Sequence, residues 1–200
     1  MFIKHENKKY FIPSKASELT YQDFLKVWDW DGIHEAEFLE KLLDIDYATA
    51  LELVDGYLKE SDFEFFRNTE YPRPDKIEIF GKEYRVQENL FKESTSGQIA
   101  TFKGLLETVK KDEWETKIYP LLPKILAIYF YPAIRKTLFT SVKYQEIIYL
   151  IEKCSYVDVL GVGFFLLKSY GDWLVWKAKR SVSQAQNKEK QELTDSVNSE

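Results

Sequence analysis

The stretch VLGVGFFLLKSYGDWLVWKAKR, residues 159–180, is the most apolar and aromatic part of the chain near its C-terminal end. It is compatible with three structures: a membrane-spanning helix, a nucleotide-binding loop, or a helix that packs against protein. Its longest uncharged run, residues 159–167, has nine residues, whereas a spanning helix needs roughly 20 apolar residues. The stretch is therefore too short to cross a membrane.

The two glycines of this stretch do not form a dinucleotide-binding fingerprint. Gly161 and Gly163 are followed by Leu166 where the third glycine belongs, and no strand bounded by turns precedes them. The chain also has no Gly-Lys-Ser/Thr sequence of a phosphate-binding loop. We therefore expect the glycines to permit close helix packing or a kink, in a helix whose Phe164–Leu167 segment is buried.

Local patterns predict a mainly α protein of the α+β class. Residues 8–13 form a short β-like segment, and residues 76–86 alternate as in a β-hairpin with Phe80–Glu83 at its turn. An amphipathic helix is predicted over residues 35–45 and a further helix over 47–59, and the chain from residue 94 to about 181 has a helical pattern. Further signals are N-caps and prolines that punctuate the helical part: Ser17 or Thr20, Asp46, Pro120, Pro123 and Pro132.

The chain contains an internal echo of a strand, a loop and a helix. Tyr10 precedes a hydroxyl-bearing helix start at Thr20 by ten residues, and Tyr84 precedes Thr95 by eleven. The echo is compatible with a duplicated unit or with an ordinary recurrence of strand–loop–helix structure. The predicted organisation has three parts: an acidic, mostly helical module with a short initial strand (1–72), a hairpin plus helical module (73–181), and a flexible polar tail (182–200).

Charge and aromatic content limit the partners that we expect. Residues 1–80 carry 10 Lys/Arg and 18 Asp/Glu, whereas residues 81–200 carry 18 and 15. The basic residues do not cluster in a stripe that would neutralise phosphates, so nucleic-acid binding is not expected. The 13 Tyr, 14 Phe and 5 Trp indicate a large core or a protein-binding surface.

The residue types of common catalytic and metal sites are sparse. His5 and His34 are the two histidines, and neither belongs to a His-Glu-x-x-His pair. Cys154 is the single cysteine. Both histidines lie far from it in the sequence and nothing local activates the thiol, so we expect it to be buried and inert. We therefore expect a non-enzymatic protein, with no catalytic residues, no cofactor and no metal site.

The order of the motifs resembles a group of phage proteins. The segments, in order, are KKYFIPSKASELTYQDFLKV, GKEYRV, LPKILAIYFYP, VKYQEIIYLIEKC and GVGFFLLKS. This order is similar to small structural or assembly proteins from the tail and neck gene blocks of tailed bacteriophages, including the crAss-like phages of gut Bacteroidales. The matching positions are Ala127, Tyr129, Phe130, Pro132, Tyr144, Glu146, Phe164 and Phe165.

The resemblance covers about residues 8–170 and implies a role in building or filling the virion. The protein would be a minor virion component or a tail assembly chaperone, or alternatively a cargo protein that is packaged and ejected with the genome. The implied partners are other virion or tail/neck proteins in an oligomeric assembly, in the virion, in the host cytoplasm during assembly, or in both.

Four aromatic residues are candidates for contact with a partner. They are Tyr129, Tyr131, Trp173 and Trp176. Trp and Tyr bury a large area at low cost in rotamer entropy, which favours them in protein interfaces. The alternative, that all four belong to the core, stays open at this stage.

Overall fold

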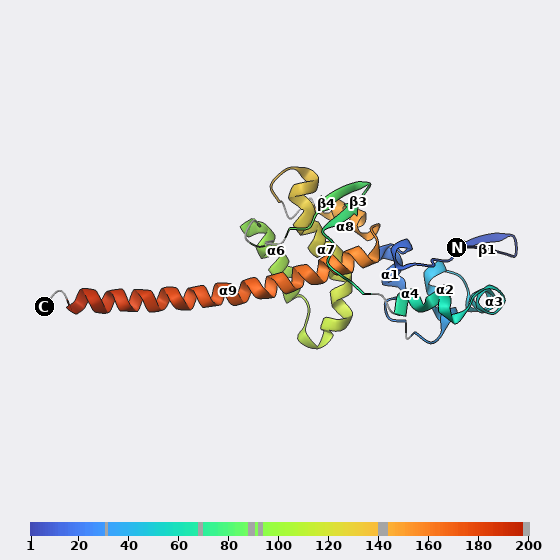
Figure 1. Ribbon diagram of the computed structural model, residues 1–200, viewed down its shortest axis with the longest axis horizontal. Helices are drawn as coiled ribbons and strands as arrows, with labels where there is room; N and C mark the ends of the chain where they lie inside the picture. The colour runs from blue at the N-terminus through green and yellow to red at the C-terminus, as the bar shows by residue number, and fades with distance from the viewer. Residues whose placement is uncertain (31, 68–69, 88–90, 92–93, 140–143, 198–200) are drawn as a thin grey trace.

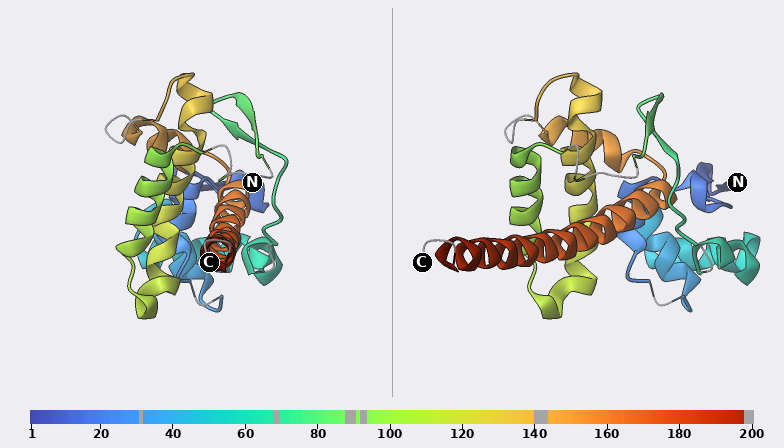
Figure 2. Two further views of the ribbon diagram at one scale, coloured as in Figure 1. Left: turned by 90° about the vertical axis from the view of Figure 1, so that its left-hand side faces the viewer. Right: turned by 60° about the vertical axis from the view of Figure 1, so that its left-hand side comes forward.

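The computed structural model describes residues 1–30, 32–67, 70–87, 91, 94–139 and 144–197 (Figures 1 and 2). It confirms the predicted fold class, because the described chain is mainly helical with two small antiparallel sheets of two strands each. Helix α9 passes α7 and extends far beyond the body, whereas the N-terminal elements lie beyond its other end (Figure 1). None of the described helices has an apolar stretch long enough to cross a membrane.

The elements follow one another in this order. The N-terminal part contains β1 (Phe2–His5), β2 (Lys8–Phe11), η1 (Ala16–Glu18), α1 (Tyr21–Val27), α2 (Glu35–Leu43), α3 (Tyr47–Tyr57), η2 (Glu60–Phe63) and α4 (Glu64–Arg67). The rest contains β3 (Lys76–Ile79), β4 (Lys82–Arg85), α6 (Ser96–Glu107), η3 (Lys111–Glu113), α7 (Trp114–Arg135), α8 (Gln145–Glu152) and α9 (Tyr156–Val197).

Both sheets are hairpins closed by two-residue turns. The central residues of each turn have positive φ, at Glu6 and Asn7 in the first hairpin and at Phe80 and Gly81 in the second. Such turns twist in the same sense as the strands that they join. The second turn is therefore tighter than the predicted Phe80–Glu83, because Lys82 and Glu83 already pair within β4.

The two strand–loop–helix units of the echo share further details. The Ile12 amide donates to the Met1 carbonyl over 2.7 Å, and the Val86 amide donates to the Asp75 carbonyl over 2.8 Å. Each bond extends the pairing of its hairpin by one residue pair, and the donor residues Ile12 and Val86 are both buried. Each following helix, α1 or α6, then begins with a capping box at Thr20 or Thr95. The predicted cap at Asp46 is also present, at the start of α3.

Helix α7 continues through three prolines, although the sequence suggested that they punctuate the helical part. A proline has no amide hydrogen, so the carbonyl group four residues before it loses its helical partner. The Pro123 ring leaves the Tyr119 carbonyl free, and the Tyr21 hydroxyl of α1 donates to this oxygen over 2.7 Å. Burial raises the pKa of Tyr21, which keeps its hydroxyl protonated as a donor.

A second proline-freed carbonyl group of α7 accepts a hydrogen bond from α6. Pro132 frees the carbonyl group of Ile128, and the side-chain amide of Gln98 donates to it over 2.9 Å. The oxygen of the same Gln98 amide accepts from the Thr95 backbone amide in the capping box. Both capped helices of the echo therefore supply one side-chain donor to a proline-freed carbonyl group of α7.

Aromatic rings fill much of the core between these helices. The Phe24 ring of α1 stacks on the Tyr156 ring of α9, with centroids 5.1 Å apart and planes inclined by 6°. The Phe66 ring lies against both of them. Two backbone hydrogen bonds, from Tyr21 to the Cys154 carbonyl and from Tyr156 to the Leu19 carbonyl, fasten the same region. One hydrophobic cluster thus contains residues from both predicted modules, 1–72 and 73–181.

The glycines at the start of α9 permit close packing, as the sequence predicts. A Cβ atom at Gly161 would collide with the carbonyl oxygen of Pro72, and one at Gly163 would lie 2.9 Å from a methyl carbon of Leu122 in α7. The segment around Pro72 and α7 therefore both approach the backbone of α9. Phe164 is 37% exposed and Leu166 is 1% exposed, so the predicted buried segment Phe164–Leu167 is only partly buried.

Residues 182–197, predicted as part of a flexible polar tail, continue α9. The sequence from 181 to 197 includes several Gln, Lys and Glu and contains no Pro or Gly. Polar residues of high helix propensity prolong a helix even where no apolar face requires it. The polar character of this segment is as predicted, but its conformation is helical.

Gly161→Ala is expected to destabilise the protein by about 1–3 kcal/mol, because the Pro72 carbonyl blocks the added methyl group. The matched control is Gly171→Ala in the same helix, where no atom lies within 4 Å of an added Cβ. The control should stabilise the protein by up to about 1 kcal/mol through helix propensity. Urea unfolding monitored by circular dichroism measures the change in unfolding free energy of each variant. Equal changes at the two positions would contradict the close contact between Gly161 and the Pro72 carbonyl.

Tyr21→Phe is expected to cost about 1–3 kcal/mol, because it leaves a buried carbonyl group without a donor. Pro123→Ala restores an amide hydrogen at the position that pairs with the Tyr119 carbonyl. In the Pro123→Ala background, Tyr21→Phe should therefore cost less, by about 1 kcal/mol. Urea unfolding of the four proteins of this double-mutant cycle measures the coupling, and an unchanged cost of Tyr21→Phe would show that the hydrogen bond does not depend on the proline.

Candidate functional site

The four predicted contact residues lie in different environments. Tyr131 is 2% exposed, and its ring packs edge-on against Phe139 with centroids 5.4 Å apart. In the described structure this ring belongs to the core and is not presented to a partner. Tyr131 is buried because most residues of α7 from 121 to 131 are buried, so this part of the helix has core on several sides.

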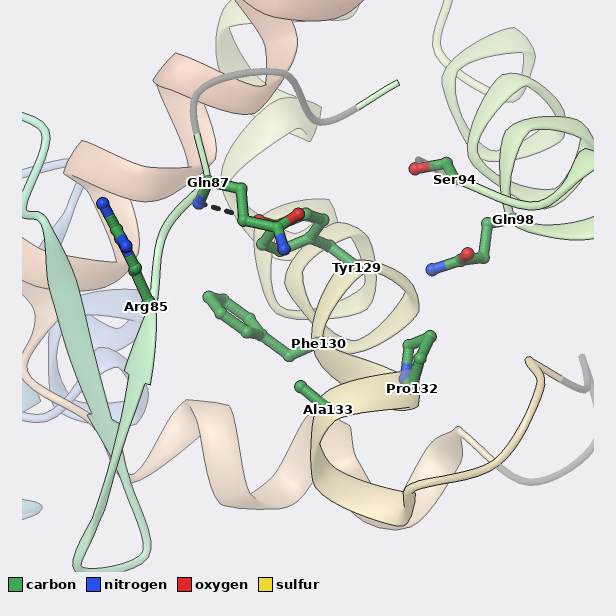
Figure 3. A pocket seen from close by; sticks show the side chains of 8 residues that line it. All are labelled: Arg85, Gln87, Ser94, Gln98, Tyr129, Phe130, Pro132 and Ala133. Atoms are coloured by element: carbon green, nitrogen blue, oxygen red, sulfur yellow. Dashed lines mark hydrogen bonds between the residues drawn. The ribbon is translucent and has the colours of Figure 1, made fainter. Parts of the chain in front are cut away.

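Tyr129 lines a pocket between β4, the start of α6 and the C-terminal half of α7 (Figure 3). The pocket has a volume of about 310 Å³ and is lined by Arg85, Gln87, Ser94, Gln98, Tyr129, Phe130, Pro132 and Ala133. The Gln87 backbone amide donates to the Tyr129 hydroxyl over 3.1 Å. Figure 3 shows Arg85 on one side of the pocket and Ser94 and Gln98 on the other.

The polar groups of this pocket serve the fold in part. The Gln98 side-chain amide is bonded to the Ile128 carbonyl and to the capping box of α6. The Arg85 side chain is exposed and lies at the rim. None of the eight lining residues is His, Asp, Glu or Cys. The described lining residues suit the binding of a polar group.

Trp173 lies where α9 leaves the body. Its ring stacks on Tyr170, with centroids 5.8 Å apart and planes inclined by 21°, and lies 6.1 Å from the Phe91 ring. The ammonium group of Lys177 lies 5.0 Å from the Trp173 ring centroid. Burial raises the pKa of the neighbouring Tyr170. Trp173 is thus half-buried and closes one edge of an internal aromatic cluster that also includes Phe102.

Three large apolar residues just beyond Trp173 are exposed. Leu174 is 45% exposed, Val175 55% and Trp176 48%. The guanidinium carbon of Arg180 lies 5.3 Å from the Trp176 ring centroid, and Lys177 and Lys179 are also exposed. We call this set the α9 surface: Leu174, Val175, Trp176, Lys177, Lys179 and Arg180.

The sequence identified Trp176 in the α9 surface but not its two apolar neighbours. The signal was present, because Trp173–Trp176 are four consecutive large apolar residues and a helix turns about 100° per residue. A single packed side of the helix therefore buries only part of such a run. Which residue is buried depends on where α9 meets Phe91.

His5, Glu6 and Glu52 form a small cluster that the sequence did not suggest. Their possible ligand atoms lie within 4.8 Å of one another. The His5 Nε2 atom lies 2.9 Å from a Glu52 carboxylate oxygen, and both glutamates are exposed. This contact joins the first hairpin to α3. Exposed carboxylates are common without an ion, and we assign no metal to this cluster.

Cys154 is buried next to the start of α9, as predicted. Its Sγ donates to the Leu150 carbonyl over 3.3 Å. Burial, with smaller contributions from Asp158 and Glu78, raises the pKa of the thiol to about 12. Because the thiolate is the reactive form, this environment disfavours nucleophilic chemistry at the sulfur.

Comparisons of the chain with protein-family models, with curated proteins and with solved structures found no match. Among the described residues, the α9 surface is the main candidate site.

Tyr131→Ala and Trp176→Ala should have very different effects on stability. Loss of a buried ring costs about 3–5 kcal/mol, so Tyr131→Ala should strongly lower the urea midpoint. An exposed residue usually changes stability by less than about 0.5 kcal/mol, so Trp176→Ala should leave the midpoint almost unchanged. A large loss of stability in Trp176→Ala would show that this ring packs within the fold and is not available to a partner.

Proposed function

We propose that this chain is a non-enzymatic structural or assembly protein that acts through protein–protein contacts in the tail, neck or capsid of a tailed bacteriophage. The observation that carries the contact-based role is the α9 surface. It presents three consecutive apolar side chains, exposed around α9, next to three basic residues.

The composition of the α9 surface is typical of a protein interface. Trp and Arg are enriched among the residues that dominate binding energy, and both are adjacent here at Trp176 and Arg180. Large apolar side chains gathered outside a folded body favour a partner that removes them from water. The α9 surface directly follows Trp173 in a helix of 42 residues that projects beyond the body, where a neighbouring subunit has access to it (Figure 1).

The phage context is supported by the resemblance of the motif order. In that group of proteins the function is to build or fill the particle, as a minor virion component or a tail assembly chaperone. Other virion or tail/neck proteins are the proposed partners.

Quantitative mass spectrometry of purified virions, of emptied particles and of infected-cell lysate tests this proposal. Presence in intact and emptied particles supports a virion component, and presence only in the lysate together with tail intermediates supports a chaperone. Presence in intact particles but loss on genome ejection supports the cargo alternative. If the protein co-purifies neither with particles nor with any assembly intermediate, the proposed function is wrong.

A further inference from the structure

We infer that the α9 surface binds the outer face of α3 in a second copy of this chain, so that copies associate head to tail. This inference rests on the proposed function and names a partner for its site. The outer face of α3 has the exposed residues Tyr47, Leu51, Glu52 and Asp55, and we call it the α3 surface.

The α3 surface offers an apolar ridge to the apolar part of the α9 surface. Tyr47 is 45% exposed and Leu51 is 42% exposed. They lie one helical turn apart on the same side of α3, and Asp55 lies one turn further on. Exposed Ala48 and Gly56 beside this ridge are small residues, which permit close approach of another helix.

The charges of the two surfaces are complementary. Residues 42–58 contain no Lys or Arg, and Asp44, Asp46, Glu52 and Asp55 are all exposed there. Residues 173–188 contain no Asp or Glu, and they include Lys177, Lys179, Arg180 and Lys188. Complementary charge around an apolar contact directs orientation and suppresses wrong partners. Pairing of two α9 surfaces would instead bring positive charges together.

The positions of the two surfaces require a second molecule. The α3 helix lies at one end of the protein, and α9 projects from the opposite end (Figures 1 and 2). One chain therefore does not bring its own two surfaces together. A contact between two different surfaces of identical copies is heterologous, and it generates a ring or an open filament. Such growth suits a protein that contributes to a repeated particle structure.

The decisive experiment uses two variants of the full chain, each with one altered surface. The first is Leu51→Lys/Asp55→Lys, and the second is Trp176→Glu/Arg180→Glu. Size-exclusion chromatography with light scattering should show that the wild-type mass rises above 23.7 kDa with concentration. Each variant alone should stay monomeric, at concentrations about tenfold above those at which the wild type associates. An equimolar mixture should form a complex of two chains, because one intact surface of each kind remains.

The controls distinguish this contact from self-pairing of α9, from membrane binding and from a general effect of added charge. Asp112→Lys, a charge change of the same sign as in the first variant but on η3, should associate like the wild type, and circular dichroism should show that all variants fold. Association of the α3-surface variant at the wild-type concentration would overturn the inference in favour of α9 self-pairing. A wild-type chain that stays monomeric, including one that instead sediments with anionic phospholipid vesicles, would also overturn it. If the monomeric chain is still found in particles, only this inference fails and the proposed function stands.

Discussion

Two hydrogen bonds to proline-freed carbonyl groups of α7 hold the helices of the body in place. Pro123 and Pro132 each remove an amide hydrogen from the helix, so α7 is not self-sufficient in hydrogen bonds. Tyr21 and Gln98 replace the missing donors from two other helices. A buried carbonyl group without a donor is costly, so these two contacts hold α1 and α6 in fixed positions against α7.

These contacts also explain the correspondence between the two halves of the echo. In each half a hairpin leads through a loop to a threonine capping box, and the capped helix then supplies a donor to α7. The donors differ, since one is the tyrosine that opens α1 and the other is the glutamine of the capping box itself. The two units thus perform one structural task with different side chains.

The same arrangement determines where α9 is packed and where it is free. Backbone hydrogen bonds at Leu19–Tyr21 fix its start, and Gly161 and Gly163 let the Pro72 segment and α7 approach it. The aromatic contacts of Tyr170 and Trp173 end this packed part. Beyond them the exposed side chains of Leu174, Val175 and Trp176 remain for a partner. A helix that is firmly held at its start is suited to present a binding surface beyond its packed part.

Structural features that depend on residues close together in the sequence were predictable from the sequence. The hairpin turn at Gly81, the caps at Thr20 and Asp46, and the amphipathic helices follow from backbone preferences and from periodicity within a few residues. The continuity of α7, the burial of Tyr131 and the exposure of Leu174 and Trp176 became evident in the folded chain alone. Each of these depends on a donor or a ring from a distant part of the chain, such as Tyr21 for Pro123 or Phe91 for Trp173. A local pattern shows that a side chain is apolar or that a carbonyl group lacks its partner, but the long-range packing decides what covers it.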